Sequence, residues 1–438
     1  MRRKALIGAL AALTLAVAGC GGDDDPGGST EALSPADPAA VQGEITVLTN
    51  RTDLVTDGTM KRYADEFTKV YPGVTVKFEA ITDYEGEVKI RMNTDNYGDV
   101  LLIPNTIAVG DYPKFFAGLG SAADVSGKYL FTSKTTVDYK VYGVASFAAS
   151  NGFVYNKDVW ARAGVTDWPT TPDEFLADLA AVKAKTDATP YYTNYKDGWP
   201  LTAWSNVVGS VTCDAGANDK LASASDPWAS GSDLGVGDRL LYDIVDRDLA
   251  EPDPSTTNWE DSKGLLATGK IATMWLGSWA VTQMRDAAEK AGTSPDSIGF
   301  MPFPTQVGGK YCAVLAPDYF YAVNVHSAKK AAARAWVDWV LDTSGFADDN
   351  EAVSSLKGAP MPAPLTPFTD AGVSFIELSQ AKTATVNEID NASEVGLTTP
   401  DYRQRLVDVA RGAAPGDADS VLAELAGKWS EAAKLAGS

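Results

Sequence analysis

The chain has 438 residues, of which 45% are hydrophobic and 22% charged, and its formal net charge is −21. This composition is typical of a globular protein rather than a disordered one, and the length favours two domains. Nucleic acid is bound by basic surfaces, so a chain this acidic is expected to have no nucleic-acid partner.

The N-terminus predicts export. A basic start at residues 2–4 precedes an apolar segment, residues 5–18, that is too short for a permanent membrane span, so residues 1–19 are expected to be a signal peptide. The sequence Val-Ala-Gly-Cys ending at Cys20 resembles a bacterial lipobox, which implies that Cys20 carries a lipid; an ordinary signal peptide cut nearby is the alternative. Residues 20–42, rich in Gly, Asp, Pro and Ser, are expected to form a disordered tether.

Strands and helices alternate from Glu44 onward. Apolar runs predict strands at residues 45–49, 74–80 and 99–104, and an apolar stripe at helical spacing predicts a helix over residues 60–70. The third run is continuous rather than alternating, so its strand is expected to be buried on both faces. Together these elements predict a βαβ unit with a mostly parallel sheet.

Residues 142–175 form the most informative stretch. An apolar run leads to the turn at residues 155–158, then to a short helix ending at Gly164 and to a second helix whose N-cap is Thr171. Glu174 completes a Thr-x-x-Glu capping box there. A long irregular region rich in Trp, Gly and Asn follows, and loops of such length are usually functional or disordered. The bounds of this region and of the later elements are as follows: irregular 191–237; helices from Leu240, at 259–269, 328–341, 402–411 and 420–436; a strand at 271–276; a second crossing at 311–325; and a Pro-rich bend at 359–364.

Two cysteines remain after Cys20. Outside the cytoplasm such a pair is commonly bonded, so a disulfide between Cys213 and Cys312 is expected; two buried free thiols are the alternative.

Three kinds of site have little support. The run from Gly264 to Ile271 fits the first seven places of a P-loop, but Ile271 stands where a Mg²⁺-binding hydroxyl is needed, and the run ends a helix and opens a strand. With a single histidine, His326, and no cysteine cluster, neither a metal site nor a Ser-His-Asp triad is expected, and no cofactor is expected. Catalysis by two carboxylates, as in glycosidases, is the remaining enzyme alternative.

The order of these parts resembles the sugar-binding group of extracytoplasmic solute-binding proteins that feed ABC importers. The motifs that carry the resemblance are Tyr-Gly-Val at 142–144, Tyr-Asn-Lys-Asp at 155–158, Tyr-Pro-Gly-Val at 71–74, Gly-Asp-Val at 98–100, Gly-Lys-Ile-Ala at 269–272 and Gly-Ser-Trp at 277–279. Ala145 replaces a common Pro, and Pro172 stands where Trp is common.

The resemblance implies a periplasmic-binding-protein-like α/β fold of type II, with two discontinuous lobes and a ligand cleft between them. The expected bounds are 43–148 plus 317–360 for the N-terminal lobe, 153–312 plus 361–438 for the C-terminal lobe, and hinge crossings near 149–152 and 313–316. It also implies a monomer without enzymatic activity that delivers a mono- or oligosaccharide to permease subunits. With the lipid expected on Cys20, the protein is expected on the outer face of the cell membrane.

Aromatic residues beside polar loop residues are the expected sugar contacts, because Trp and Tyr stack on sugar rings while polar groups bind hydroxyls. In the first lobe they follow strand ends, where ligands of parallel sheets bind; in the second lobe they follow from the resemblance. The candidates are Asn50 to Asp53, Tyr84, Asn105, Asn151, Trp199, Trp204, Trp228, Trp275, Trp279, Asp318 and Tyr319. Each of the tryptophans has the alternative of a core position, and Asp53 and Asp318 that of a cap or turn residue.

The same fold with a polyol or polyamine ligand is a further alternative. A cationic ligand would require several acids in the cleft beside the aromatic residues.

Overall fold

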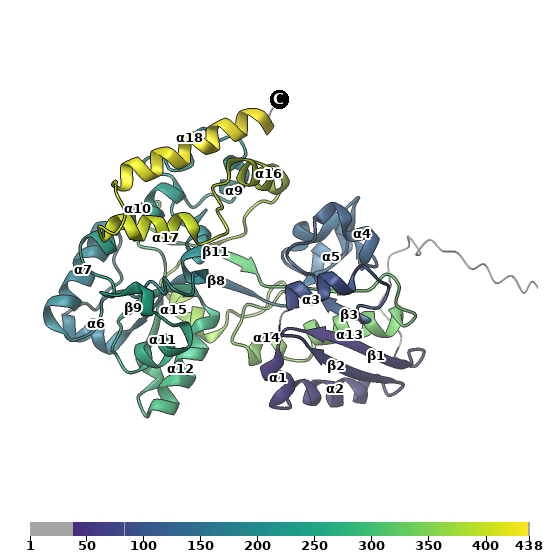
Figure 1. Cartoon of the computed structure of the whole chain (residues 1–438). Coiled ribbons are helices and arrows are strands. Elements are labelled where there is room, and N and C mark those ends of the chain that lie inside the picture. The colour runs from purple at the N-terminus through teal and green to yellow at the C-terminus, as the bar shows by residue number, and fades with distance from the viewer. Residues whose placement is uncertain (1–37, 83, 437–438) are drawn as a thin grey trace, which may run out of the picture.

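The computed structural model describes residues 38–82 and 84–436. The expected signal peptide, Cys20 and most of the tether therefore lie outside the described residues. Figure 1 shows two lobes side by side, with the strands β8 and β11 running between them. Within the described ranges, no helix combines the length and the apolar character needed to cross a membrane.

The first lobe is built on a five-stranded sheet in the order β2-β1-β3-β12-β7, in which β1 pairs in parallel with β2 and β3 while β12 is antiparallel to β3 and β7. All three residues of β3 are buried, as the continuous apolar run predicted. The strands are β1 (Gly43–Thr49), β2 (Val74–Ala80), β3 (Val100–Leu102), β7 (Val144–Ala145) and β12 (Phe320–Val323). A small sheet of β4 (Gly120–Ser121), β6 (Lys140–Val141) and β5 (Thr136–Val137) is added to this lobe.

Helices pack on this sheet through aromatic side chains. Phe67 on α2 meets Trp336 on α13 edge to face, with ring centroids 5.2 Å apart, and both side chains are buried. The helices of this lobe are α1 (Thr52–Thr56), α2 (Thr59–Val70), α3 (Tyr84–Arg91), α4 (Tyr112–Phe115), α5 (Ala122–Lys128), α13 (Lys330–Asp342) and α14 (Phe346–Asp349).

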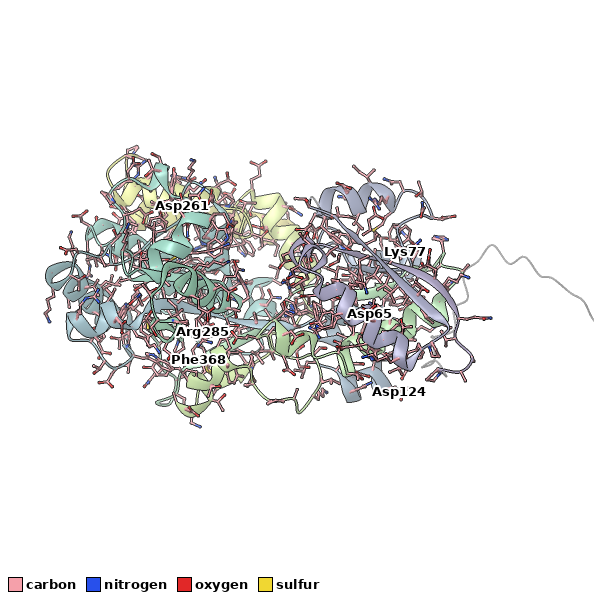
Figure 2. All side chains as sticks on the ribbon, turned by 90° about the horizontal axis from the view of Figure 1, so that it is seen from below. Asp65, Lys77, Asp124, Asp261, Arg285 and Phe368 are labelled. Carbon is pink, nitrogen blue, oxygen red and sulfur yellow. A yellow bond between two sulfur atoms is a disulfide. The ribbon has the colours of Figure 1, made fainter. Side chains whose placement is uncertain are left out.

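The second lobe has a sheet in the order β10-β8-β11-β13, with β9 also paired to β8. Its strands are β8 (Ala148–Asn156), β9 (Thr273–Gly277), β10 (Ile298–Met301), β11 (Cys312–Pro317) and β13 (Ser374–Ile376). Its helices are α6 (Lys157–Ala163), α7 (Pro172–Lys185), α8 (Trp199–Thr202), α9 (Ala217–Leu221), α10 (Asp233–Asp246), α11 (Trp259–Ala267), α12 (Trp279–Ala291), α15 (Thr366–Asp370), α16 (Thr383–Ser393), α17 (Asp401–Ala410) and α18 (Ala418–Ala436). Figure 2 shows charged side chains on both lobes, among them Asp65 and Lys77 on the first and Asp261 and Arg285 on the second.

The chain passes between the lobes along paired strands. Ser150, Ala149 and Ala148 of β8 lie opposite Leu315, Ala316 and Pro317 of β11, and Ala148 also forms a bridge with Val353. Three segments far apart in the sequence therefore run together at the junction of the two lobes.

The start of α7 differs in detail from the expected capping box. The Thr171 hydroxyl accepts a hydrogen bond from the Glu174 amide at 3.1 Å, as the motif predicts. The Glu174 carboxylate accepts mainly from the amide and hydroxyl of Thr170, each at 2.7 Å. The Thr171 amide, the partner that the motif predicts, makes a weaker contribution.

The irregular region is shorter than expected. Helix α10 begins at Asp233, with Ser232 as its N-cap, instead of at Leu240. Glycines at 235 and 237 argue against a helix in this first turn when the sequence is read alone. Both are buried and closely packed, and a Cβ on Gly235 would collide with the carbonyls of Ala229 and Trp228. Close packing thus outweighs the low helix propensity of glycine.

Candidate functional site

Three tryptophans meet on the side of the second lobe that faces the first. Ring centroids of Trp199 and Trp259 are 5.0 Å apart, those of Trp259 and Trp279 5.7 Å, and those of Trp199 and Trp279 5.9 Å. Each residue is the first of its helix, α8, α11 and α12 respectively. Because three helices begin at the same place, their first side chains form one cluster, which we call the tryptophan cluster.

Trp259 was not among the predicted site residues. Its sequence context indicates a helix start, since Asn258 caps α11 by accepting a hydrogen bond from the Asp261 amide at 3.0 Å. The Asp197 carboxylate accepts the amide hydrogen of Trp259 and ties the loop before α8 to α11. Lys263, also missed, places its ammonium group 5.0 Å from the Trp259 ring. Only the meeting of separate helices reveals these two residues.

Polar groups of the first lobe gather around Arg51, immediately after β1. The Arg51 guanidinium forms an ion pair with Asp53 at 2.7 Å and donates a hydrogen bond to the side-chain oxygen of Asn350. Asn50, the residue before it, is half-buried, and its carbonyl accepts the Thr52 amide at 3.0 Å. Arg51 and Asn350 are thus fixed in place, while the Asp53 side chain remains 60% exposed.

A cavity of about 1040 Å³ joins these two groups of residues. From the first lobe and the crossing it is lined by Arg51, Asp53, Leu54, Asp57, Phe147, Asp318, Asp349 and Asn350; from the second lobe it is lined by Glu260, Lys263, Gly264, Trp279, Thr282, Gln283, Asp286, Ala287, Lys290 and Ala291. We call this cavity the interlobe cleft. It brings together the predicted residues Asp53, Trp279 and Asp318.

Asp318 lines the interlobe cleft, directly after β11. Part of its side chain faces solvent in the cleft, but the surrounding protein atoms desolvate the carboxylate and raise its pKa to about 6, an effect that the positive charge of Arg51 only partly offsets. The Asp318 amide donates to the Phe147 carbonyl at 3.0 Å, which fixes the backbone. A carboxylate held in this way can accept hydrogen bonds from hydroxyl groups or pair with a cation.

Three further predicted residues lie together near the start of α3. Tyr84 is only 4% exposed, and its hydroxyl donates to the Leu102 carbonyl at 3.0 Å and accepts from the Leu102 amide at 2.7 Å, so it fixes β3 rather than facing a cleft. Tyr319 packs edge-on against it at 5.9 Å, and burial raises the pKa of Tyr319. Asn105 is exposed and donates to the Glu85 carboxylate at 3.1 Å.

The structure places Trp204, Trp228 and Trp275 in the core of the second lobe, with at most 5% of each residue exposed. Their indole nitrogens donate to Tyr191, Asp238 and the Ala203 carbonyl respectively. Because protein atoms cover the rings of these three tryptophans and accept hydrogen bonds from their indole N–H groups, the three residues support the lobe. They do not reach the interlobe cleft.

Asn151 and Trp199 have intermediate positions. Asn151 is half-buried, is 3.5 Å from Asn206, and lines a separate cavity of about 210 Å³ that also contacts Lys134 of the first lobe. Trp199 is 37% exposed and reaches the interlobe cleft through its contact with Trp279.

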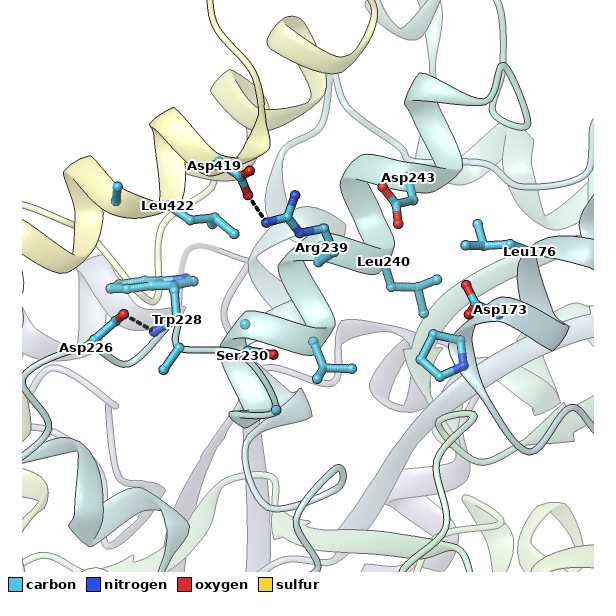
Figure 3. A pocket seen from close by; sticks show the side chains of 16 residues that line it. Asp173, Leu176, Asp226, Trp228, Ser230, Arg239, Leu240, Asp243, Asp419 and Leu422 are labelled. Carbon is cyan, nitrogen blue, oxygen red and sulfur yellow. Dashed lines mark hydrogen bonds and ion pairs between the residues drawn. The ribbon is translucent and has the colours of Figure 1, made fainter.

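Another cavity, of about 560 Å³, lies between α7, α10 and α18 (Figure 3). It is lined by one lobe only, and its Arg239 is paired with Asp419. Because its lining within the described ranges comes from the second lobe, this cavity does not depend on relative motion of the lobes, and we do not assign the ligand to it.

The remaining predictions concern covalent and metal sites. Cys213 and Cys312 form a disulfide, with Cα atoms 5.4 Å apart. The P-loop-like run joins the end of α11 to β9, a helix-to-strand connection unlike that of a phosphate-binding loop. In the parts of the chain that the structure describes, no group of three or more His, Cys, Asp or Glu residues is arranged to hold a metal ion.

Comparisons with known proteins agree on one family. The family model described as bacterial extracellular solute-binding protein matches residues 52–345. A binding protein of an ABC transporter from Bifidobacterium animalis subsp. lactis, solved with mannobiose, has a TM-score of 0.81 and 32% identity over 91% of this chain and 96% of its own. A manno-oligosaccharide-specific protein of the same organism, solved with mannotriose, has a TM-score of 0.82 and 29% identity with the same coverage. The diacetylchitobiose-binding protein DasA of Streptomyces coelicolor is 27% identical over 82% of this chain and 85% of its own length.

Proposed function

The chain belongs to the family of bacterial extracellular solute-binding proteins, with the type II periplasmic-binding-protein fold, and from this premise we propose that it captures a carbohydrate and delivers it to an ABC permease. The observation that carries the proposal is Trp279, which lines the interlobe cleft together with Arg51 and Asp53 and is packed against the other two rings of the tryptophan cluster. Apolar sugar faces stack on such rings, while the charged groups bind hydroxyls.

The size of the cleft supports an oligosaccharide. Its volume of about 1040 Å³ lies just above the roughly 300–1,000 Å³ that is usual for small-molecule sites, which leaves room for more than one sugar ring. The relatives solved with mannobiose and mannotriose make short manno-oligosaccharides the first ligands to test.

Delivery requires that the permease distinguish the loaded receptor from the empty one. We propose hinge bending at residues 149–152 and 313–316, because β8 and β11 pair there and carry the chain from lobe to lobe. The lobes would comprise residues 43–148 plus 317–360 and residues 153–312 plus 361–438. No reaction is needed for this function, which rests on the difference between two conformations.

We further propose that the protein acts as a monomer on the outer face of the cell membrane, anchored through a lipid on Cys20. The Val-Ala-Gly-Cys sequence supports this anchor, and residues 20–42 are long enough to serve as a tether. Metabolic labelling with a fatty-acid analogue tests the anchor: label should be incorporated by the natural protein and not by the Cys20→Ala variant.

A cationic ligand, such as a polyamine, is a second candidate that one observation favours. Acidic side chains outnumber basic ones in the cleft lining: Asp53, Asp57, Glu260, Asp286, Asp318 and Asp349 against Arg51, Lys263 and Lys290. Most of the bases are already paired, Arg51 with Asp53 and Lys263 with Glu260. The excess negative charge would attract amines and repel acidic sugars.

Thermal melting against a ligand panel decides between these candidates. A ligand that binds the native state at a hundred times its Kd adds about 2.7 kcal/mol to the free energy of unfolding and raises Tm. Mannobiose, mannotriose, diacetylchitobiose, polyols and polyamines form the panel. A shift with one neutral sugar class supports the sugar receptor, a shift with amines alone supports the second candidate, and consumption of a glycoside would indicate an enzyme.

A further inference from the structure

Three consecutive residues at the end of α14 bind three different elements, and we call them the strap: Asp349, Asn350 and Glu351. The Asp349 carboxylate accepts a hydrogen bond from the Tyr63 hydroxyl on α2 at 2.6 Å. The Asn350 side-chain oxygen accepts from Arg51 in the cleft. The first two strap residues therefore belong to the framework of the first lobe.

Glu351 contacts the opposite lobe. Its carboxylate accepts a hydrogen bond from the Thr282 hydroxyl at 2.6 Å, and the Arg285 guanidinium lies 3.6 Å from the same oxygen. Thr282 and Arg285 are one and two turns beyond Trp279, the first residue of α12. In Figure 1 α14 lies between the two lobes, so Glu351 links the first lobe to the helix that carries Trp279.

The backbone holds Glu351 in this place. Its φ angle of 46° is in the left-handed region, which is unfavourable for a side chain other than glycine and is retained only where the surroundings enforce it. Its amide donates to the Asp348 carbonyl at 2.9 Å, and the Val353 amide donates to Ala148 at 2.8 Å. Fixed on both sides, Glu351 cannot follow α12 freely when the lobes move.

The cleft that this link spans is accessible to solvent. The cavity between the two walls has a volume of about 1040 Å³, and the Asp53 side chain on one wall is 60% exposed, so the walls stand apart in the described arrangement. The hydrogen bond between Glu351 and Thr282 is therefore made with the cleft open. Movement of α12 toward Arg51 would change the distance between a fixed carboxylate and a moving hydroxyl.

We propose that Glu351 is a positioning residue, a latch that stabilises the open cleft by tying α12, and with it Trp279, to the strap in the open arrangement. This inference rests on the proposed function, because it assumes closure around a ligand. When only a fraction of the receptor is in the closed state, the apparent Kd equals the intrinsic Kd divided by that fraction. The latch lowers the closed fraction and therefore weakens affinity. Its removal should tighten binding, whereas removal of an ordinary contact residue weakens it.

The test uses Glu351→Ala, which removes the carboxylate that accepts from Thr282 and lies beside Arg285. Kd for mannotriose, measured by calorimetry, is expected to fall about 3- to 10-fold in Glu351→Ala, the range that corresponds to one hydrogen bond. Glu289→Ala, the same change at an exposed position of α12, is the matched control and should leave Kd unchanged.

A second measurement needs no sugar and so separates this inference from the proposed ligand. Spin labels at Asp65→Cys and Asp261→Cys, on opposite lobes (Figure 2), report the distribution of interlobe distances in the ligand-free protein. In both Glu351→Ala and Thr282→Val the fraction of short distances should rise. An unchanged distribution in these two variants overturns the latch, even if mannotriose binds, and so does a weaker affinity in Glu351→Ala.

Discussion

Arg403 donates a hydrogen bond from Nε to the Asp238 carboxylate at 2.9 Å, and both side chains are shut off from solvent, at 0% and 1% exposure. The same carboxylate accepts from the Trp228 indole at 2.8 Å and from the Tyr402 hydroxyl at 2.9 Å. This single carboxylate therefore joins α10, α17 and the loop before α10 in the core of the second lobe. It also explains why Trp228 is a structural residue.

Removal of the Asp238 carboxylate should strongly destabilise the protein. Asp238→Ala leaves Arg403 buried without its counter-charge, and a broken buried pair typically costs about 3–5 kcal/mol in the free energy of unfolding. Urea unfolding followed by circular dichroism measures the loss. Asp246→Ala, at an exposed position of the same helix, serves as the control; a loss of similar size in both variants would refute the role of the ion pair.

Ligand affinity should depend on Trp259 although no sequence motif marks it. Trp259 supports Trp279 at 5.7 Å and Trp199 at 5.0 Å, so Trp259→Ala removes one face of the cluster. The loss of an apolar contact of this size corresponds to an increase in Kd of about 10- to 100-fold for the sugar found in the melting panel. Trp168→Phe, which alters a half-buried tryptophan elsewhere in the lobe, should leave Kd unchanged.

Trp204 and Trp279 mark the limit of what the sequence can predict. Both lie among polar, loop-forming residues, yet one is 1% exposed in the core and the other lines the cleft. Regular elements followed from local patterns: the Thr171 cap predicted α7, and the continuous apolar run predicted the buried β3. Burial of a loop tryptophan, by contrast, depends on which distant helix packs over it, and that information is not local.

Glu251 should make stability depend on pH. Its carboxylate accepts the Thr193 amide at 2.8 Å, but burial raises its pKa from 4.5 to about 7. The folded state thus binds a proton more tightly than the unfolded state. The free energy of unfolding therefore falls as pH rises from 4.5 to 7. Above pH 7 the full loss is present. Glu251→Gln, which is neutral at every pH, should gain about 2–3 kcal/mol relative to the natural protein between pH 5 and pH 8. A difference that does not vary with pH in urea titrations would contradict this assignment.

The disulfide between Cys213 and Cys312 should contribute to stability without taking part in binding. It closes a loop with a sequence separation of 99 residues, and in the chain-entropy model such a loop corresponds to about 4–5 kcal/mol. The double variant Cys213→Ser, Cys312→Ser should lose about 3–5 kcal/mol of the free energy of unfolding, measured in urea. Its Kd for the ligand, measured well below the Tm of the variant, should stay within about twofold of that of the natural protein. A large change in Kd with little change in stability would instead tie the bridge to the cleft.

Gly277, the last residue of β9, should be required for the position of the Trp279 ring rather than for the formation of β9. A Cβ built on Gly277 would collide with the indole ring of Trp279, two residues later, so Gly277→Ala must push that ring out of the cluster. The expected result is an increase in Kd of about tenfold, because one stacking surface is displaced while the fold is kept.

Gly427→Ala is the matched control for this change. Gly427 lies within α18, where an added Cβ meets nothing within 4 Å, so the variant should gain up to about 1 kcal/mol from helix propensity and keep its affinity. Intrinsic tryptophan fluorescence distinguishes the two: its emission should shift in Gly277→Ala and stay constant in Gly427→Ala. If Gly277→Ala bound sugar normally with a shifted emission, Trp279 would be close to the cleft but not a ligand contact, and the stacking role would pass to Trp199 and Trp259.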